Sequence, residues 1–488
     1  MSDISHLQPK NVLHFFEALC AIPHGSGNTR AISDYCVAFA KERGLAVWQD
    51  EANNVVIIKE AAPGYESAPA VILQGHLDMV CDQDKDCDLD MTKDGLRLRT
   101  DGAYVWAEGT TLGGDDGIAV AMALAALDDD SLPHPRLEMV FTTDEETGML
   151  GAAALNPSML TGRFLLNIDS EVEGVLTVSC AGGVRGTCHV PVDYCDAEGV
   201  FCGLIIKGLI GGHSGVEIHK GRANANQLMG RMLSALTAEV PVHLAAIVGG
   251  QADNAIAGEC AATMVIPAEH VSRAAEIVQA LGEAMRHEYQ TADPGLQVVW
   301  KQDPQAEVHE AVTTAEASRR VADALLLLPH GIQSWSADIP GLVQTSLNLG
   351  VARMAAGELT ATYAVRSSLS SEKAWVCARL ERLTALLGGH VTYVGDYPAW
   401  EYQKESRLRE LVADVYRKET GKEPVIEAIH AGLECGIFAG KLPGLDAISL
   451  GPNLLEIHTT REKMDVASVE RTWELVCEVL RRSKELAQ

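Results

Sequence analysis

Three short apolar runs of this chain each end in side chains that bind metal ions or carry protons. The runs begin at residues 71, 137 and 164 and lead into His76, into the pair Glu145 and Glu146, and into Asp169. Runs of this length rich in Val, Ile, Leu and Phe are typical of strands buried on both faces of a parallel sheet. Open parallel sheets carry their sites at the carboxyl ends of the strands, so these side chains should meet at one edge. We therefore expect an α/β fold with a mixed, mostly parallel sheet flanked by helices.

The adjacent acids Glu145 and Glu146 are suited to two different roles. Neighbouring side chains point in different directions, so one Glu can bind a metal ion while the other stays free to move a proton. The pair therefore indicates metal-assisted acid–base chemistry.

A glycine-rich stretch offers another carboxylate. Residues 109–117 contain Asp115 and Asp116, just before the Ala-rich segment 118–127. The glycines permit a close approach of the backbone, and an acid at the mouth of a helix caps it and lies at the favourable end of its dipole. We expect Asp115 or Asp116 to join the edge of the sheet.

A second imidazole completes a set of donors for two metal ions. His458 follows a late apolar run at residues 447–450. Imidazole nitrogen together with carboxylate oxygen suits zinc, whereas an all-oxygen shell would suggest magnesium or calcium. Two His and three carboxylates are too many for one tetrahedral ion, but they fit two ions about 3.5–4 Å apart with a bridging carboxylate. The expected ligands are His76, His458, Asp115 as the bridge, Asp169 and one of the pair Glu145 and Glu146, and cobalt or manganese could replace zinc.

Composition sets limits on partners and compartment. At 488 residues the chain exceeds what one core usually holds, so two domains are expected. The formal net charge of -28 speaks against nucleic acid or an anionic membrane surface as partner. The 12 Cys form no Cys-x-x-Cys, residues 1–10 lack the apolar core of a signal peptide, and no stretch approaches the roughly 20 apolar residues of a membrane span. We expect a reduced, cytoplasmic protein.

The order of strand-like and helical patterns predicts a catalytic domain interrupted by a lid. Residues 1–185 alternate the two patterns, as in the first part of a doubly wound catalytic domain. Residues 186–398 read as an inserted α+β lid that binds substrate, and its size suggests two modules in tandem. Residues 399–488 must rejoin the first sheet, because His458 has to reach the metal ions, and they close with an amphipathic helix over 466–486. Such a lid would close over a small ligand and exclude long peptides.

Five sequence blocks resemble a known family. They are residues 76–80 (HLDMV), 113–117 (GGDDG), 143–148 (TDEETG), 167–171 (NIDSE) and 211–215 (GGHSG). On these blocks the chain resembles the di-zinc exopeptidases that include carboxypeptidases, aminoacylases and dipeptidases, and the resemblance extends over nearly the whole chain. Within that family, residues 205–219, 224–226 and 429–436 are most similar to the bacterial aminoacyl-histidine dipeptidases.

The resemblance implies a role for each predicted ligand and its neighbours. Asp115 matches the bridging ligand, Glu146 and His458 match the ligands of one zinc, and His76 and Asp169 match those of the other. Glu145 matches the general base. Asp78 matches the acid that holds the His76 imidazole, since residues two apart on an extended chain face the same way. The family also has a cis peptide after the bridging Asp, here Asp115-Asp116.

Four further residues are candidates for contacts with substrate, three of them by resemblance. His213 matches an imidazole that the family assigns to the oxyanion of the tetrahedral intermediate. Asn254 and Arg366 resemble substrate-holding residues, and an Arg fork is matched to a carboxylate. Glu434 could hold the free amine of a dipeptide. Plainer interpretations remain: His213 and Asn254 as turn residues, Arg366 as a surface ion-pair partner, and Glu434 as a helix cap.

Two departures from the family pattern concern the metal site. Residue 116 is Asp where many relatives have Asn, which adds negative charge near the ions. The final ligand follows Glu456 and Ile457, where Gly-Pro or a similar pair is usual. Because this loop is altered, the position of His458 is less well defined by the resemblance than the positions of the other ligands.

The activity implied by the resemblance is zinc-dependent hydrolysis of dipeptides, Xaa-His including β-alanyl-histidine (carnosine). Two zinc ions would lower the pKa of a shared water, and Glu145 would take its proton and return it to the leaving amine. The expected partner is a small peptide, and a homodimer is implied by the family alone.

Other functions remain open at this stage. A broad-specificity dipeptidase, an aminotripeptidase or an N-acyl-amino-acid deacylase would use the same metal shell and differ in pocket shape. A metal-binding protein without hydrolytic activity is a second alternative, against which the presence of Glu145 argues. A phosphoesterase is disfavoured because the chain lacks a Gly-Lys-Ser/Thr phosphate loop.

Overall fold

A computed structural model describes residues 4, 6–303 and 311–487 of the chain. The argument against a signal peptide, drawn from residues 1–10, falls in part on residues 1–3 and 5, which lie outside the described residues. Among the helices that are described, none combines the length and the apolar character needed to cross a membrane.

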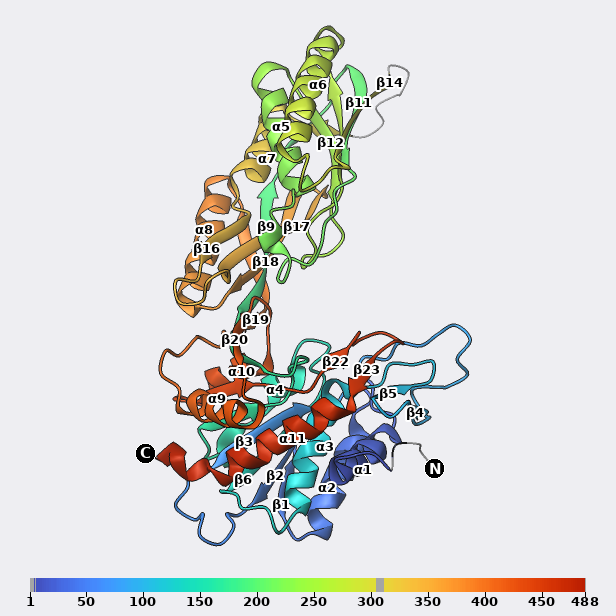
Figure 1. The fold of residues 1–488 in the computed structure, drawn as a ribbon. Coiled ribbons are helices and arrows are strands. Elements are labelled where there is room, and N and C mark those ends of the chain that lie inside the picture. The colour runs from blue at the N-terminus through green and yellow to red at the C-terminus, as the bar shows by residue number, and fades with distance from the viewer. Residues whose placement is uncertain (1–3, 5, 304–310, 488) are drawn as a thin grey trace. The chain divides into compact units, whose positions relative to one another are not determined.

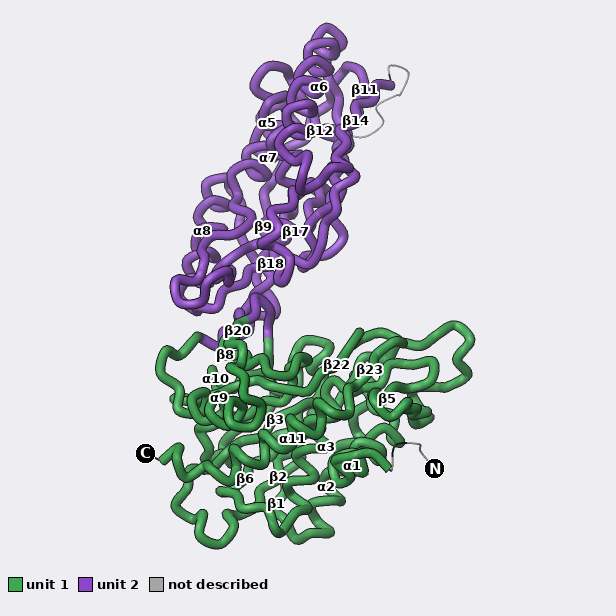
Figure 2. Tube along the Cα trace, viewed as in Figure 1, with its two compact units in different colours: residues 1–180, 402–428, 433–488 green, residues 181–401, 429–432 purple. Residues whose placement is uncertain are grey.

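The chain divides into two compact units (Figure 2). The first unit comprises residues 1–180, 402–428 and 433–488, and the second comprises residues 181–401 and 429–432. The four residues 429–432 pack with the second unit although both flanking segments belong to the first, which no sequence pattern indicated. The interpretation of residues 1–185 and 399–488 as a catalytic domain and of 186–398 as its lid stays a prediction.

The first unit is built on an eight-stranded mixed sheet flanked by helices (Figure 1), which confirms the predicted fold class. The four central strands, in the order β6-β3-β7-β21, run parallel, and β2 and β8 pair antiparallel with the outer two of them. In spatial order the strands are β1 (Ala46–Gln49), β2 (Val55–Lys59), β6 (Leu137–Thr142), β3 (Val71–His76), β7 (Phe164–Asn167), β21 (Asp446–Ser449), β8 (Val175–Cys180) and β20 (Val425–Ile429). All six residues of β3 and all six of β6 are buried, as expected for central parallel strands.

Helices cover this sheet and bury its apolar residues in one core. The Ala-rich α3 packs against β3 and α1, and its residues 116–127 are all buried, because small side chains allow close approach on every face. Helix α9 packs on β21 and on α11. The helices are α1 (Lys10–Cys20), α2 (Arg30–Glu42), α3 (Gly114–Asp128), α4 (Leu150–Ala154), α9 (Arg407–Thr420), α10 (Glu434–Lys441) and α11 (Val466–Arg481), with the 3-10 turns η1 (Pro157–Met159) and η4 (Ser483–Ala487).

A small antiparallel sheet in the first unit supports the loop that carries His458. Its order is β22 (Leu454–Leu455), β23 (Lys463–Asp465), β5 (Tyr104–Ala107) and β4 (Leu98–Thr100). The helix predicted over residues 466–486 begins as expected, because the Asp465 side chain caps it by accepting from the Ser468 amide. Its α-helical part ends at Arg481, however, and the chain continues as η4.

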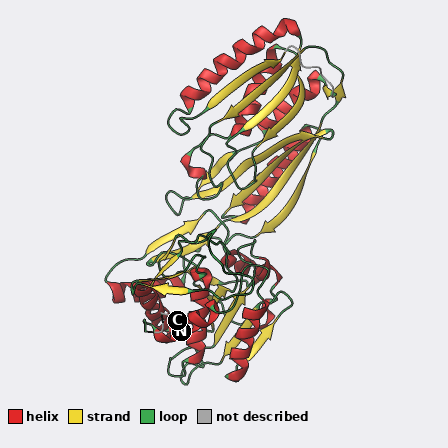
Figure 3. Ribbon diagram, turned by 90° about the vertical axis from the view of Figure 1, so that its right-hand side faces the viewer, coloured by secondary structure: helices red, strands yellow, loops and turns green. Residues whose placement is uncertain are grey.

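The second unit carries a nine-stranded sheet in which one α+β arrangement occurs twice (Figure 3). The first module runs β11 (Val200–Lys207), α5 (Ala225–Glu239), β12 (His243–Gly249), β13 (Cys260–Ile266), α6 (Val271–Glu288) and β14 (Gln297–Asp303). The other runs β9 (Gly182–Pro191), α7 (Ala315–Leu327), β17 (Val343–Ala355), β18 (Glu358–Ser367), α8 (Ser370–Leu386) and β19 (His390–Tyr397). Their strand orders match, β14-β11-β13-β12 against β19-β9-β18-β17, and β12 pairs antiparallel with β17 to join them.

The remaining elements of the second unit are short. Strand β16 (Gly331–Trp335) pairs with the first half of β17, and β10 (Tyr194–Cys195) pairs with β15 (Val312–Thr313). The 3-10 turns are η2 (Ile218–Lys220) and η3 (Ala268–His270). Burial alternates residue by residue along β18, so one face of the sheet packs on helices and the other is more exposed.

Candidate metal centre

The carboxyl ends of the parallel strands bring the predicted ligands to one edge of the first sheet. His76 is the last residue of β3 and lies opposite Thr142, the last residue of β6. Glu145 and Glu146 follow Thr142 in the next turn, and Asp169 comes two residues after β7. The register of the strands therefore places side chains from three of them at the same level.

Asp115 presents its two carboxylate oxygens to two different imidazoles. Its Oδ1 lies 3.2 Å from Nε2 of His76, and its Oδ2 lies 3.1 Å from Nε2 of His458. This is the arrangement expected of a carboxylate that bridges two metal ions. The peptide bond between Asp115 and Asp116 is cis, as predicted.

Each imidazole has a further carboxylate beside it. Nε2 of His76 lies 3.7 Å from Oδ1 of Asp169, and Nε2 of His458 lies 2.9 Å from Oε1 of Glu146. Three groups of donors, within each of which all ligand atoms lie within 4.8 Å of one another, occur among the described residues. They are Asp115, Glu146 and His458; His76, Glu145 and Glu146; and His76, Asp116 and Asp169.

Asp78 ties the His76 imidazole to the turn that carries the paired glutamates. Nδ1 of His76 lies 2.9 Å from the main-chain carbonyl of Asp78, whereas the nearer carboxylate oxygen is 3.6 Å away. The carboxylate accepts from the amides of Glu145 at 3.1 Å and Glu146 at 3.4 Å and from the Ser26 hydroxyl at 2.8 Å. The contact with His76 is thus mainly through the backbone, and the side chain of Asp78 orders the glutamate turn.

The charges at this edge fit divalent cations. Burial, followed by nearby carboxylates, raises the pKa of Glu145 to about 9 and that of Glu171 to about 7, and burial raises the pKa of Asp169 to about 6. Hydrogen bonds with Asp115 and Glu146 raise the pKa of His458 to about 10. So many carboxylates gathered at one partly buried edge are costly without compensating positive charge, and two imidazoles do not supply it. The donor set suits zinc or a similar ion.

Asp116 is buried behind the ligands. Its Oδ2 accepts from the His76 amide at 3.2 Å, and burial with the neighbouring Asp169 raises its pKa well above the usual value. A side chain at Gly75 would place its Cβ 2.6 Å from the same oxygen and 2.6 Å from Ala119 Cβ. Gly75 therefore lets α3 approach β3 closely enough to present Asp115.

Sequence reasoning missed Glu462, which holds the loop before Asp115. Its Oε2 accepts from the amides of Leu112 at 2.8 Å and Gly113 at 3.1 Å, and its Oε1 accepts from the Gly114 amide at 2.8 Å. The side chain is buried, and burial raises its pKa. In the sequence Glu462 is a carboxylate next to a lysine, and that pattern does not predict that it accepts from three buried amides.

Glu434, predicted to contact substrate, lies in the first unit at the start of α10. Its Oε2 accepts from Gln74 Nε2 at 2.5 Å and Thr142 Oγ1 at 2.6 Å, whereas Oε1 is buried without a hydrogen-bond partner. Burial raises the pKa of Glu434 to about 7. It is a buried carboxylate with one free oxygen, and it is not simply a helix cap.

The other predicted substrate residues lie in the second unit. Nδ1 of His213 accepts from the amides of Gly215 and Val216, both at 3.2 Å. The carbonyl of Asn254 accepts from the Ser214 amide at 2.8 Å, which pins the His213 turn, although the Asn254 side chain itself is exposed. Burial and the charge of Arg366 lower the pKa of His213.

Arg366 has an unexpected neighbour in the second unit, His430. Nε of Arg366 and Nδ1 of His430 are both buried without hydrogen-bond partners, and Ser346, opposite Arg366 on the neighbouring strand, lies 2.7 Å from Nε2 of His430. Nη1 of Arg366 donates to the Tyr397 hydroxyl at 3.2 Å. His430 belongs to a block quoted for the family resemblance, but nothing in the sequence gave it a role.

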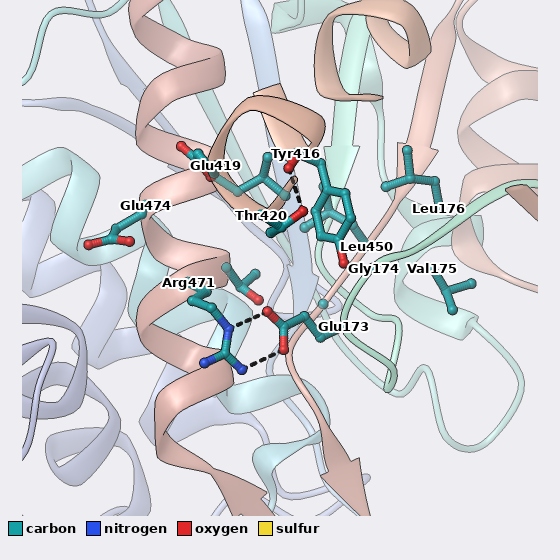
Figure 4. Close-up of a pocket in the computed structure, with 13 residues that line it drawn as sticks. Glu173, Gly174, Val175, Leu176, Tyr416, Glu419, Thr420, Leu450, Arg471 and Glu474 are labelled. Atoms are coloured by element: carbon teal, nitrogen blue, oxygen red, sulfur yellow. Dashed lines mark hydrogen bonds and ion pairs between the residues drawn. The ribbon is translucent and has the colours of Figure 1, made fainter. Parts of the chain in front are cut away.

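A cavity of about 190 Å³ in the first unit is lined by none of the predicted ligands (Figure 4). Arg471 forms two hydrogen bonds with the carboxylate of Glu173, at 2.5 and 2.6 Å, and Thr420 Oγ1 donates to the Tyr416 carbonyl at 2.7 Å. These polar groups satisfy one another, whereas Oε1 of Glu434, near the metal-binding edge, is buried without a hydrogen-bond partner.

Comparisons with known proteins agree with this geometry. The model of Peptidase family M20/M25/M40 matches residues 72–482. The cytosol non-specific dipeptidase of Escherichia coli (strain K12) is 37% identical over 486 residues, which are 99% of this chain and 99% of that protein. The crystal structure of aminoacylhistidine dipeptidase from Vibrio alginolyticus matches with a TM-score of 0.92 and 36% identity over 99% of this chain and 98% of its own. A tripeptidase from Staphylococcus aureus, with a TM-score of 0.55 and 17% identity over 98% of this chain and 99% of its own, shares the fold.

Proposed function

Because this chain belongs to peptidase family M20/M25/M40, we propose that it is a metallo-dipeptidase that cleaves dipeptides ending in histidine, Xaa-His including β-alanyl-histidine. The family resemblance drawn from the sequence blocks is thereby confirmed. The observation that carries the proposal is the carboxylate of Asp115 placed between the imidazoles of His76 and His458. The name of the relative from Vibrio alginolyticus supports the histidine preference, and that of the Escherichia coli relative supports dipeptides in general.

We propose that two zinc ions bind at the sheet edge, one held by Glu146 and His458, the other by His76 and Asp169, with Asp115 shared. When bound, the ions lower the pKa of the attacking water and polarise the scissile carbonyl. The proposed proton carrier is Glu145, whose carboxylate would take the proton of the attacking water and return it to the leaving amine. The Asp78 carboxylate accepts from the amides of Glu145 and Glu146, and so fixes the positions of the proposed base and the proposed ligand relative to each other.

His213 would donate a hydrogen bond to the oxyanion that forms during attack. Because two backbone amides donate to Nδ1, the ring proton is assigned to Nε2, which leaves that nitrogen as the free donor. The lowered pKa keeps the ring neutral near pH 7, so it acts as a donor without a full charge.

The two ends of a dipeptide call for opposite charges. Arg366, whose Nε has no partner, would bind the carboxylate together with Asn254. Glu434, with its free Oε1, would bind the ammonium group. These roles predict that free dipeptides are preferred over N-acylated amino acids and over longer peptides.

A substrate panel tests the proposal against its alternatives on the same site. Purified protein loaded with zinc should hydrolyse Xaa-His dipeptides, including β-alanyl-histidine, faster than tripeptides and N-acetylated amino acids. A broad-specificity dipeptidase would cleave dipeptides without a histidine equally well. Binding of two zinc equivalents without hydrolysis of any peptide would refute the proposal. We further propose a cytoplasmic homodimer, which size measurement in solution would test.

A further inference from the structure

A groove of about 330 Å³ in the first unit borders the metal-binding edge directly. One of its walls is Glu146, whose Oε1 lies 2.9 Å from Nε2 of His458. The other lining residues come from three segments and the residue after Glu146: Gly25, Ser26, Asn28, Met79, Val80, Cys81, Met91, Thr92 and Thr147. The volume is at the lower end for ligand sites, about 300–1,000 Å³, and suits one side chain better than a whole peptide.

Hydrogen bonds join the segments that line the groove to one another and to the turn that carries Glu146. The Ser26 amide donates to the Met79 carbonyl at 3.3 Å, and Nδ2 of Asn28 donates to the Thr92 carbonyl at 3.2 Å. The Ser26 hydroxyl donates to Oδ2 of Asp78, the carboxylate that also orders the glutamate turn. The groove and Glu146 are therefore parts of one hydrogen-bonded framework.

The chemistry of the lining favours a neutral, apolar occupant. Met79 and Met91 are buried, and Val80 and Cys81 extend the apolar surface. Polar groups from Ser26, Asn28, Thr92 and Thr147 stand among them, and none of the described residues that line the groove is positively charged. Methionine side chains adapt to ligands of different shape, so such a lining accepts a range of apolar groups.

A close contact identifies the position that sets the size of the groove. A Cβ added at Gly25 would lie 2.5 Å from Sγ of Cys81, so the Cys81 side chain packs directly over the Gly25 backbone. The absence of a side chain at residue 25 is therefore required for Cys81 to take this position. Cys81 lines the groove, so a larger side chain at this position is expected to narrow it.

We propose that this groove binds the side chain of the first residue of the dipeptide and selects neutral, apolar side chains there. The inference rests on the proposed function, because it assumes a peptide held at the metal ions. The groove and Glu434, the group proposed for the ammonium, both belong to the first unit. The first unit thus supplies the recognition of the first residue.

Substitutions that fill or enlarge the groove test this assignment. In Cys81→Phe, the ratio of kcat/KM for Leu-His to kcat/KM for Gly-His should fall about tenfold or more, because the aromatic ring occupies the space of the leucine side chain. In Met91→Ala, the ratio of kcat/KM for Trp-His to kcat/KM for Leu-His should rise severalfold, because the groove is larger. The matched control is Cys87→Phe, a cysteine of the same loop region that does not line the groove, and it should keep the wild-type ratios.

The measured quantity is a ratio of kcat/KM values for two substrates, so a general loss of folded protein or of metal would leave it unchanged. Zinc content and circular dichroism of each variant establish that the folded metal form is compared. Equal losses for Leu-His and Gly-His in Cys81→Phe, with unchanged ratios in Met91→Ala, would overturn the inference. A wild-type enzyme that cleaves no dipeptide would refute the proposed function itself, whereas an active enzyme with unchanged ratios refutes the groove assignment alone.

Discussion

Oδ2 of Asp115 lies 3.1 Å from Nε2 of His458, although the two residues are 343 positions apart in the chain. The other oxygen of the same carboxylate faces His76. Removing Asp115 should therefore affect both proposed ions, whereas removing His458 should affect only one.

The first prediction concerns metal content. After incubation with excess zinc and desalting, Asp115→Ala should retain close to no zinc, and His458→Ala should retain about one equivalent fewer than the wild type. Elemental analysis per folded protein gives the measurement. Two equivalents in Asp115→Ala would show that this carboxylate is not the bridge.

The second prediction separates chemistry from metal binding. Glu145→Gln removes the proton acceptor but keeps size and polarity, so kcat should fall about 10²–10⁴-fold with zinc content unchanged. Steady-state kinetics on a Xaa-His dipeptide and elemental analysis give the two values. Glu51→Gln, an exposed site, is the control. A Glu145→Gln enzyme within tenfold of the wild type would exclude the residue as general base.

Much of the metal-binding edge follows from local sequence. His76 ends β3, Asp169 lies two residues after β7 and Glu146 lies four residues after β6, so the prediction that these runs are parallel strands is enough to place the three side chains at one edge. His458 was predicted less directly, from the apolar run at residues 447–450 and from the family resemblance, because the strand just before it, β22, is only two residues long.

The supporting contacts could not be predicted in the same way. Glu462 and the amides it holds, at Leu112 to Gly114, are about 350 residues apart in sequence, and only the folded backbone brings them together. Residues 429–432 join the second unit for a similar reason, since their pairing with Ala181 depends on tertiary structure. Local patterns carry no information on such contacts.

The third prediction tests Glu462. In Glu462→Ala three amides lose a buried acceptor, so the protein should be less stable by about 3 kcal/mol and the Asp115 loop should lose zinc affinity. Urea unfolding with zinc removed measures the first effect, and zinc titration measures the second. Glu423→Ala, which removes an exposed ion pair with Arg417, should change stability by less than about 1 kcal/mol. Equal stabilities of the two variants would contradict the assignment.

The fourth prediction concerns His430 and pH. Burial, with the nearby charge of Arg366, lowers the pKa of His430 to about 3, below the unfolded value of about 6.5. The unfolded chain therefore binds this proton first, and stability is lost as the pH falls below about 6.5. Between pH 7 and 4.5 the wild type should lose about 2–3 kcal/mol more unfolding free energy than His430→Gln, whose side chain does not titrate. Parallel losses in the two proteins would show that His430 titrates normally.

The fifth prediction addresses Glu434, whose Oε2 is held by Gln74 and Thr142 while Oε1 has no partner. An unpaired oxygen on a fully buried carboxylate is costly, and a substrate ammonium would both fill the position and match its charge. The variant Glu434→Gln keeps the two existing contacts within reach but loses the charge. The kcat/KM for Leu-His should therefore fall about 10–100-fold, mainly through KM, which corresponds to the roughly 1.5–3 kcal/mol of a charged hydrogen bond.

The companion substrate for Glu434 is N-acetyl-Leu-His, which has no ammonium group. The wild type should discriminate strongly against it, and the variant should discriminate about 10–100-fold less, because only the free-amine substrate loses a partner. A structural role for Glu434 would instead lower both rates by the same factor and leave the discrimination as it was. Zinc content, measured on the same samples, should not change, since neither of the two hydrogen-bond partners of Glu434 is a proposed metal ligand.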